Sequence, residues 1–138
     1  MLIRAAVVQM DCVLGEKEKN LESIRQWIEA GADEKAQIVV LPELFNTGYQ
    51  TAEQDSELAE PIPGPTTEFC LALAQKYGVW ICGAIMEKTK RGIYDTAFLI
   101  SPQKLVGTYR KTHLWKGEEK RFLRGRSFPV YHSLFGKI

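Results

Sequence analysis

Five short apolar runs, separated by two kinds of connection, constrain the fold of this chain more than any other feature. The first three runs cover residues 3–10, 38–41 and 79–86, and long segments with helical periodicity lie between them. The last two, 94–100 and 105–109, follow after turns of a few residues. Parallel strands need long crossover connections, whereas antiparallel strands can be joined by tight turns. The spacing therefore predicts an α/β fold with a mixed β-sheet whose last three strands form an antiparallel meander.

Two of the connections are predicted to be amphipathic helices. Apolar residues recur at three- and four-residue spacing over residues 17–35, with charged residues between them. A second helix is expected to begin at Pro65, because proline suits the first helical position, and to end at Gly78. Residues 45–65 are expected to form a loop with at most one short helix. Pro42, which lacks a backbone N–H, is expected to end the second strand. Each helix has one apolar face, so we expect the helices on one face of the sheet.

The composition restricts the classes of partner. The 138 residues suffice for one domain with its own core, and 45% of them are hydrophobic and 25% charged, as in ordinary globular proteins. The formal net charge of +1 gives no reason to expect nucleic acid or an anionic membrane surface as a partner. Basic residues gather modestly between positions 116 and 126, and a solvated face is the expected interpretation of that cluster.

The N-terminus and the cysteines indicate a cytoplasmic protein. The first residues lack the basic leader and small-residue cleavage site of a signal peptide. No segment approaches the roughly 18 uninterrupted apolar residues of a membrane span. Cys12, Cys70 and Cys82 have neither metal-ligand nor CxxC spacing, and an odd count without a disulfide framework suits a reducing compartment. We interpret all three as small core or loop residues rather than nucleophiles.

Two charged residues stand where apolar runs end, Glu43 after the second run and Lys111 after the fifth. In apolar surroundings the pKa of a carboxyl rises toward a value useful for proton transfer, and an ammonium can stabilise developing negative charge. If the two side chains meet, each favours the charged form of the other, which opposes the effect of burial on Glu43. Taken singly, Glu43 can also be a solvated loop residue, and Lys111 with Arg110 can protect a sheet edge.

Four segments, taken in order, carry a family resemblance. They are residues 5–10 (AAVVQM), 41–49 (LPELFNTGY), 94–97 (YDTA) and 109–114 (YRKTHL). Together they resemble the first strand, the glutamate motif, the Y-N-(S/T)-A strand start and the lysine motif of the nitrilase superfamily, the carbon–nitrogen hydrolases. Asp95 stands where the third motif has asparagine. The resemblance extends over essentially the whole chain.

The resemblance implies a Glu–Lys–Cys mechanism and assigns roles to particular residues. Glu43 would be the general base, and Lys111 would stabilise the oxyanion. A second glutamate is implied at Glu118, with Glu119 as the alternative, and it would orient Lys111 and the substrate. Arg124 stands where many relatives have proline, which leaves the local register open.

The same resemblance implies that part of the domain lies outside the sequence. The nucleophilic cysteine of the family would lie beyond Ile138. Residues 1–138 are therefore expected to be the N-terminal part of one carbon–nitrogen hydrolase domain, truncated before the nucleophile. Their fold would be half of a nitrilase-like four-layer αββα sandwich, with a large apolar patch on the uncovered sheet face.

The implied function is hydrolysis of non-peptide carbon–nitrogen bonds in small amide, nitrile or N-carbamoyl substrates, through a thioester acyl-enzyme. The resemblance implies no metal or organic cofactor, and it implies a homodimer or higher homo-oligomer. The alternative is a catalytically inactive nitrilase-like fragment that acts as a binding or interaction module. A cysteine shortly after Ile138 would discriminate between the two. The motifs do not select the substrate, because nitrile, amide and carbamoyl hydrolases share them.

Overall fold

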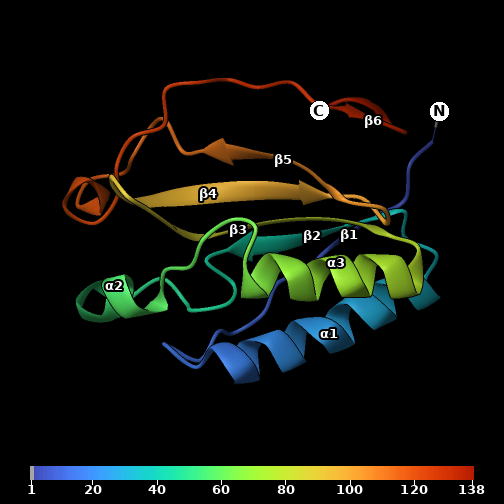
Figure 1. Ribbon diagram of the computed structural model, residues 1–138. Coiled ribbons are helices and arrows are strands. Elements are labelled where there is room, and N and C mark those ends of the chain that lie inside the picture. The colour runs from blue at the N-terminus through green and yellow to red at the C-terminus, as the bar shows by residue number, and fades with distance from the viewer. Residues whose placement is uncertain (1) are drawn as a thin grey trace.

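The computed structural model describes residues 2–138 and contains a five-stranded mixed sheet with helices packed on one face (Figure 1). The predicted fold class is confirmed. In chain order the elements are β1 (Ala5–Val7), α1 (Lys17–Asp33), β2 (Ile38–Glu43), η1 (Ala52–Gln54), α2 (Asp55–Leu58), α3 (Pro65–Tyr77), β3 (Trp80–Thr89), β4 (Gly92–Ile100), β5 (Leu105–Arg110), η2 (Glu118–Lys120), β6 (His132–Ser133) and β7 (Gly136–Lys137).

The strands lie in the sheet in the same order as in the chain. β1, β2 and β3 are parallel, and β3, β4 and β5 form an antiparallel meander, as the two kinds of connection predicted. In the register of the sheet, Glu43 on β2 pairs with Ala84 on β3, Ala84 pairs with Ala97 on β4, and Ala97 pairs with Tyr109 on β5. This row of residues crosses the sheet from β2 to β5, with Glu43 at its β2 end.

The hydrophobic core lies between the sheet and the two long helices, α1 and α3 (Figure 1). Ile24 and Ile28 of α1, one helical turn apart, are fully buried against it. A Cβ atom at Gly31 would lie 3.2 Å from Ala6, so glycine allows α1 to approach the sheet closely. α3 begins at Pro65 and is followed by Gly78 in the left-handed conformation, as predicted.

Two expected boundaries were wrong. The first strand spans Ala5–Val7 only, rather than residues 3–10. The second strand does not end at Pro42 but continues to Glu43, with an irregularity in its pairing between Val40 and Glu43. Proline is tolerated where ladder pairing is interrupted, and the regular pairing resumes at the next residue. The sheet therefore holds the backbone of Glu43 directly.

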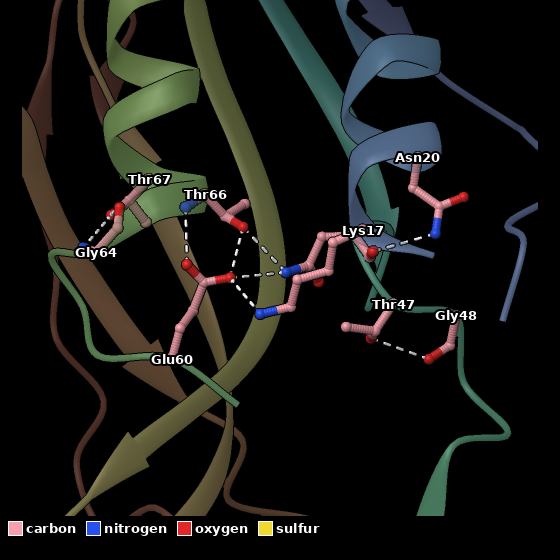
Figure 2. A network of polar contacts seen from close by, with 9 residues as sticks. Lys17, Asn20, Thr47, Gly48, Glu60, Gly64, Thr66 and Thr67 are labelled. Carbon is pink, nitrogen blue, oxygen red and sulfur yellow. Dashed lines mark hydrogen bonds and ion pairs between the residues drawn. The ribbon is translucent and has the colours of Figure 1, made fainter. Parts of the chain in front are cut away.

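A buried polar cluster ties the segment after β2 to both long helices. We call Glu60, Lys17, Asn46 and Thr66 the Glu60 cluster. Glu60 accepts hydrogen bonds from Lys17 Nζ (3.1 Å), Asn46 Nδ2 (3.1 Å), Thr66 Oγ1 (2.6 Å) and the Thr66 backbone N–H (2.8 Å). Figure 2 shows Glu60 between the first turns of the helices that carry Lys17 and Thr66. Because Asn46 follows Glu43 by three residues, this cluster fixes the segment that leaves the candidate site.

The C-terminal segment packs on part of the sheet face opposite the helices. The Tyr131 hydroxyl donates to Thr108 O (2.6 Å) and accepts from Thr108 N–H (3.0 Å), and its ring lies against Gly107, where a Cβ would clash. Trp80 contacts Phe135 edge to face, with ring centroids 5.5 Å apart. Val7, farther along the same face, remains exposed. Among residues 2–138, no helix combines the length and apolarity that crossing a membrane requires.

Candidate active site

Glu43 and Lys111 meet above two small residues of the intervening strands. Glu43 ends β2 and Lys111 follows β5, so β3 and β4 lie between them. Neighbouring strands are about 4.8 Å apart, and only long side chains can bridge such a gap. Ala84 on β3 and Ala97 on β4 lie between the two charged residues, and their small side chains leave the space above the sheet free. A cavity of about 170 Å³ results, lined by Glu43, Ala84, Asp95, Ala97, Tyr109 and Lys111.

Lys111 is the centre of the polar contacts. Its Nζ lies 2.7 Å from Glu43 Oε1, 2.9 Å from Glu118 Oε1 and 3.5 Å from Asp95 Oδ2. Partial burial disfavours the ammonium, but the hydrogen bonds to Glu43 and Glu118 outweigh that effect and raise the pKa of Lys111. The lysine is therefore a permanent cation near neutral pH. It suits stabilisation of negative charge and not proton abstraction.

Burial and attraction by Lys111 have opposite effects on the pKa of Glu43, and the structure shows which is larger. Burial raises the pKa of this carboxyl, but hydrogen bonds from Asp95 and Lys111 lower it more, and the net pKa lies below its usual value. The side chain remains 43% exposed. Glu43 is thus ionised at neutral pH and able to accept a proton from a group that enters the cavity.

Glu118 contacts Lys111, whereas Glu119 does not lie among its contacts. The side chain of Glu118 is 1% exposed, and its Oε1 also accepts from the Tyr49 hydroxyl (2.8 Å). Its Oε2 accepts from the Trp115 backbone N–H (2.6 Å). Burial disfavours the carboxylate, but these donors lower its pKa. Glu119 is exposed and pairs with Arg124. Of the two alternatives, Glu118 is the one that can orient Lys111.

Sequence reasoning missed the contacts that support Glu118. Arg121 binds Asp55 through two nitrogens (2.7 and 2.9 Å) and donates to the Tyr49 carbonyl (2.7 Å). Its guanidinium carbon also lies 5.2 Å from the centroid of the Tyr49 ring. Tyr49 is the last residue of the glutamate motif, so its place near the site could have been inferred from the sequence. Asp55 and Arg121 are 66 positions apart, and no local pattern connects them.

The carboxylates could be read as a metal site, but the lysine already supplies the positive charge. Oxygen atoms of Glu43, Asp95 and Glu118 lie within 4.8 Å of one another. Lys111 Nζ lies within 3.5 Å of an oxygen of each of them. An ion among these oxygens would have to displace the ammonium. The donor set therefore favours a lysine-centred site.

None of the three cysteines has the surroundings of an activated thiol. Burial raises the pKa of Cys12, with a contribution from Asp11, and it also raises the pKa of Cys70 and of Cys82. A reactive cysteine needs the opposite shift, because the thiolate is the nucleophile. No cysteine of the described chain lines the cavity at Lys111.

Comparisons with known proteins identify the family of this chain. The carbon–nitrogen hydrolase family model matches residues 4–138. The chain is 37% identical to a nitrilase of Pyrococcus abyssi over 141 residues, covering 99% of this chain and 54% of that protein. It is 37% identical to an omega-amidase of Danio rerio, covering 98% of this chain and 52% of that protein.

A solved structure of the same superfamily has the same fold over most of this chain. A Saccharomyces cerevisiae protein, described as a member of branch 10 of the nitrilase superfamily, superposes with a TM-score of 0.85 at 28% identity. The match covers 98% of this chain and 53% of that one. The chain spans about half the length of the relatives that it matches. On these findings, the chain belongs to the carbon–nitrogen hydrolases of the nitrilase superfamily.

Proposed function

We propose that residues 1–138 are the N-terminal part of one carbon–nitrogen hydrolase domain and carry the acid–base half of its active site. The substrates proposed are small molecules with a non-peptide carbon–nitrogen bond, in amides, nitriles or N-carbamoyl compounds. The observation that carries the proposal is the Lys111 ammonium held between Glu43 and Glu118 at 2.7 and 2.9 Å, beside an open cavity. The nitrilase and omega-amidase relatives support this choice of reaction class.

In the proposed reaction, Glu43 accepts the proton of a cysteine thiol that lies beyond Ile138. The sulfur attacks the carbonyl or nitrile carbon, and Lys111 stabilises the negative charge that develops on oxygen or nitrogen. For an amide, Glu43 then returns the proton to the leaving nitrogen, the carbon–nitrogen bond breaks, and a thioester remains. A water molecule then attacks the thioester carbon, and Glu43 takes its proton. The carbon–sulfur bond breaks, Glu43 passes the proton to the departing sulfur, and the acid is released with the thiol and the Glu43 carboxylate restored.

Glu118 has a supporting role in this proposal. Its two oxygens accept three donors besides any substrate contact, so it stays ionised and fixed. A fixed carboxylate holds the Lys111 ammonium charged and aimed at the cavity, which costs no reorganisation during the reaction. The cytoplasmic location and the homodimeric or larger assembly, expected from the sequence, belong to the proposal as well.

A second candidate function is a catalytically inactive module that binds a small molecule or a partner. It is favoured by one observation, namely that no cysteine of the described chain lines the cavity. The two candidates differ in one property: a nucleophile within reach of Glu43 and Lys111.

The test is made on the full-length protein. Intact mass spectrometry first establishes its length, and a panel of small amides, nitriles and N-carbamoyl compounds is then assayed. We expect release of ammonia or amine, and a mass increase equal to the acyl group when the reaction is stopped early. Turnover by the Glu43→Gln variant at the wild-type rate would contradict the role of Glu43. A full-length protein that binds these compounds without an acyl adduct or product would favour the inactive module.

A further inference from the structure

A fourth ionisable side chain, Asp95, faces the same cavity, and the proposed reaction does not use it. Asp95 lies on β4, in the sheet interior between Glu43 and Lys111. Its side chain is 3% exposed. Its backbone carbonyl accepts from the Lys111 N–H (2.9 Å), so the main chain holds the two residues in register. An oxygen of its carboxyl lies within 4.8 Å of carboxylate oxygens of Glu43 and Glu118.

The charges around Lys111 do not balance if every carboxyl is ionised. Glu43 from β2, Asp95 from β4 and Glu118 from η2 surround one ammonium, from the residue after β5. Three carboxylates with oxygens within 4.8 Å would leave two uncompensated negative charges, and two of the three groups, Asp95 and Glu118, are buried. Like charges at such distances cannot all ionise readily. The arrangement therefore favours retention of a proton by one of the three carboxyls.

The hydrogen-bond partners identify which carboxyl holds it. Glu118 accepts from three donors, and Glu43 accepts directly from Lys111 at 2.7 Å while remaining partly solvated. Asp95 Oδ2 is buried without a hydrogen-bond partner, and Lys111 Nζ lies 3.5 Å from it, beyond a normal hydrogen bond. Asp95 is thus the carboxyl that its surroundings stabilise least as an anion.

The remaining neighbours of Asp95 bring no further charge. β3 contributes Ala84 and Met86, which are uncharged. Tyr109 of β5 lines the cavity, but its hydroxyl is bonded to Thr112 Oγ1 (2.9 Å). In agreement with this arrangement, burial first, and then Glu43, raise the pKa of Asp95 to about 7.

We propose that Asp95 is a positioning residue that carries a proton and donates it in a hydrogen bond to Glu43. This hydrogen bond holds the Glu43 carboxylate ionised and directs its free oxygen toward the cavity. When Asp95 loses the proton, its anion repels Glu43 and attracts the Lys111 ammonium, so both the base and the oxyanion stabiliser are displaced. The proposal rests on the proposed function for its kinetic consequence but not for the proton itself.

The first experiment detects the proton without relying on activity. Infrared spectra of the full-length protein are recorded at pH 6, where an ordinary carboxyl with a pKa near 4 is ionised. We expect the carbonyl band of a protonated carboxylic acid, lost on raising the pH through about 7, where the pKa of Asp95 lies. The band should be absent in Asp95→Asn and present in Asp33→Asn, a matched change at an exposed position. No band at pH 6, or a band that persists in Asp95→Asn, overturns the proposal.

The second experiment measures kcat/KM against pH for the wild type, Asp95→Ala and Asp95→Asn. Asparagine keeps the shape and always donates an N–H, whereas alanine donates nothing. We expect Asp95→Ala to lower kcat by about tenfold or more through misplacement of Glu43, and Asp95→Asn to recover most of that loss. The decline of the wild-type rate above neutral pH should vanish in Asp95→Asn. An unchanged decline in Asp95→Asn overturns the proposal.

The two experiments separate this inference from the proposed function. If the protein hydrolyses nothing, but the infrared band is present and Asp95→Asn removes it, the proton on Asp95 stands and the proposed function fails. If turnover is found without the band, the proposed function stands and the inference on Asp95 fails.

Discussion

Two lysine–glutamate pairs in this molecule are built alike, but the two glutamates differ in exposure and in the number of hydrogen bonds that they accept. Lys17 and Lys111 have equally exposed side chains, at 27% each, and each contacts a glutamate distant in sequence. Glu60 is 6% exposed and accepts four donors in the Glu60 cluster (Figure 2). Glu43 is 43% exposed, and among the described residues Lys111 donates a hydrogen bond to it at 2.7 Å.

The difference indicates how one pair of residue types serves two purposes. When every oxygen lone pair of a buried carboxylate is occupied, the group has no capacity left for a reaction, and its contribution is to hold segments together. When a carboxylate keeps free lone pairs beside a cavity, it can take up a proton. The Glu60 cluster is therefore expected to determine stability, and the Lys111 site to determine activity.

The largest expected effect separates the two lysines. Lys111→Met removes the proposed stabiliser of developing charge, and we expect it to lower kcat by about 10²–10³-fold in the full-length protein. Lys17→Met, at equal exposure, is expected to lower kcat less than about threefold, because it touches no group at the cavity. Steady-state kinetics on both variants check the comparison, and equal losses would contradict it.

The converse comparison concerns stability. Glu60→Gln keeps the size of the side chain but places an amide NH2, itself a donor, against the donors that Glu60 accepts from. We expect it to lower the free energy of unfolding by about 2–3 kcal/mol. Glu43→Gln removes one of three crowded carboxylates and is expected to change it by less than about 1 kcal/mol. Urea unfolding of the two variants measures both values. A larger loss in Glu43→Gln would mean that the distinction is wrong.

The third prediction uses pH. Because the pKa of Asp95 is raised to about 7, the folded state binds more protons than the unfolded state between about pH 4 and pH 7. The stability contributed by the protonated Asp95 is therefore present below that range and is lost as the pH rises through 7. Asp95→Asn, which does not titrate, should gain stability relative to the wild type by about 2–3 kcal/mol between pH 5 and pH 8. Chemical unfolding at the two pH values measures this difference, and a constant difference would refute the prediction.

The smallest expected effect concerns Tyr49. Tyr49→Phe removes one of the donors to Glu118 but leaves those from Lys111 and Trp115 in place. We expect a loss of about 1 kcal/mol in stability and a fall of a few-fold in kcat. A matched change, Tyr131→Phe, removes a hydroxyl bonded only to the β5 backbone and should leave kcat nearer to the wild-type value. Kinetics and unfolding of both variants provide the check.

Most of the fold could be predicted because its signals are local. The spacing of the apolar runs, Pro65 and Gly78 are all read within a few residues, and the structure confirms the mixed sheet and the second helix. The prediction that Pro42 ends the second strand was wrong, because the effect of a proline on a strand depends on its pairing with the neighbouring strand. The pairing irregularity of β2 accommodates a residue without an N–H, and regular pairing returns at Glu43.

The candidate site was predictable in its residue types but not in its connections. Glu43, Lys111 and Glu118 were named from motifs, and the structure brings the three together. The contact between Arg121 and Asp55 joins positions 66 residues apart, and no periodicity can report such a contact. Glu118 and Glu119 are adjacent and chemically identical, so only the direction of each side chain distinguishes them.

The sequence by itself determined the order of the elements, the family and the residue types at the site, because these follow from covalent spacing and from motifs. Only the tertiary structure decided the state of charge. Whether Glu43 is ionised depends on the distances to Lys111 and Asp95, and whether Asp95 holds a proton depends on its burial in the sheet interior. Desolvation and Coulomb attraction act through space, and the distances that set them exist only after β2, β4 and β5 lie in one sheet.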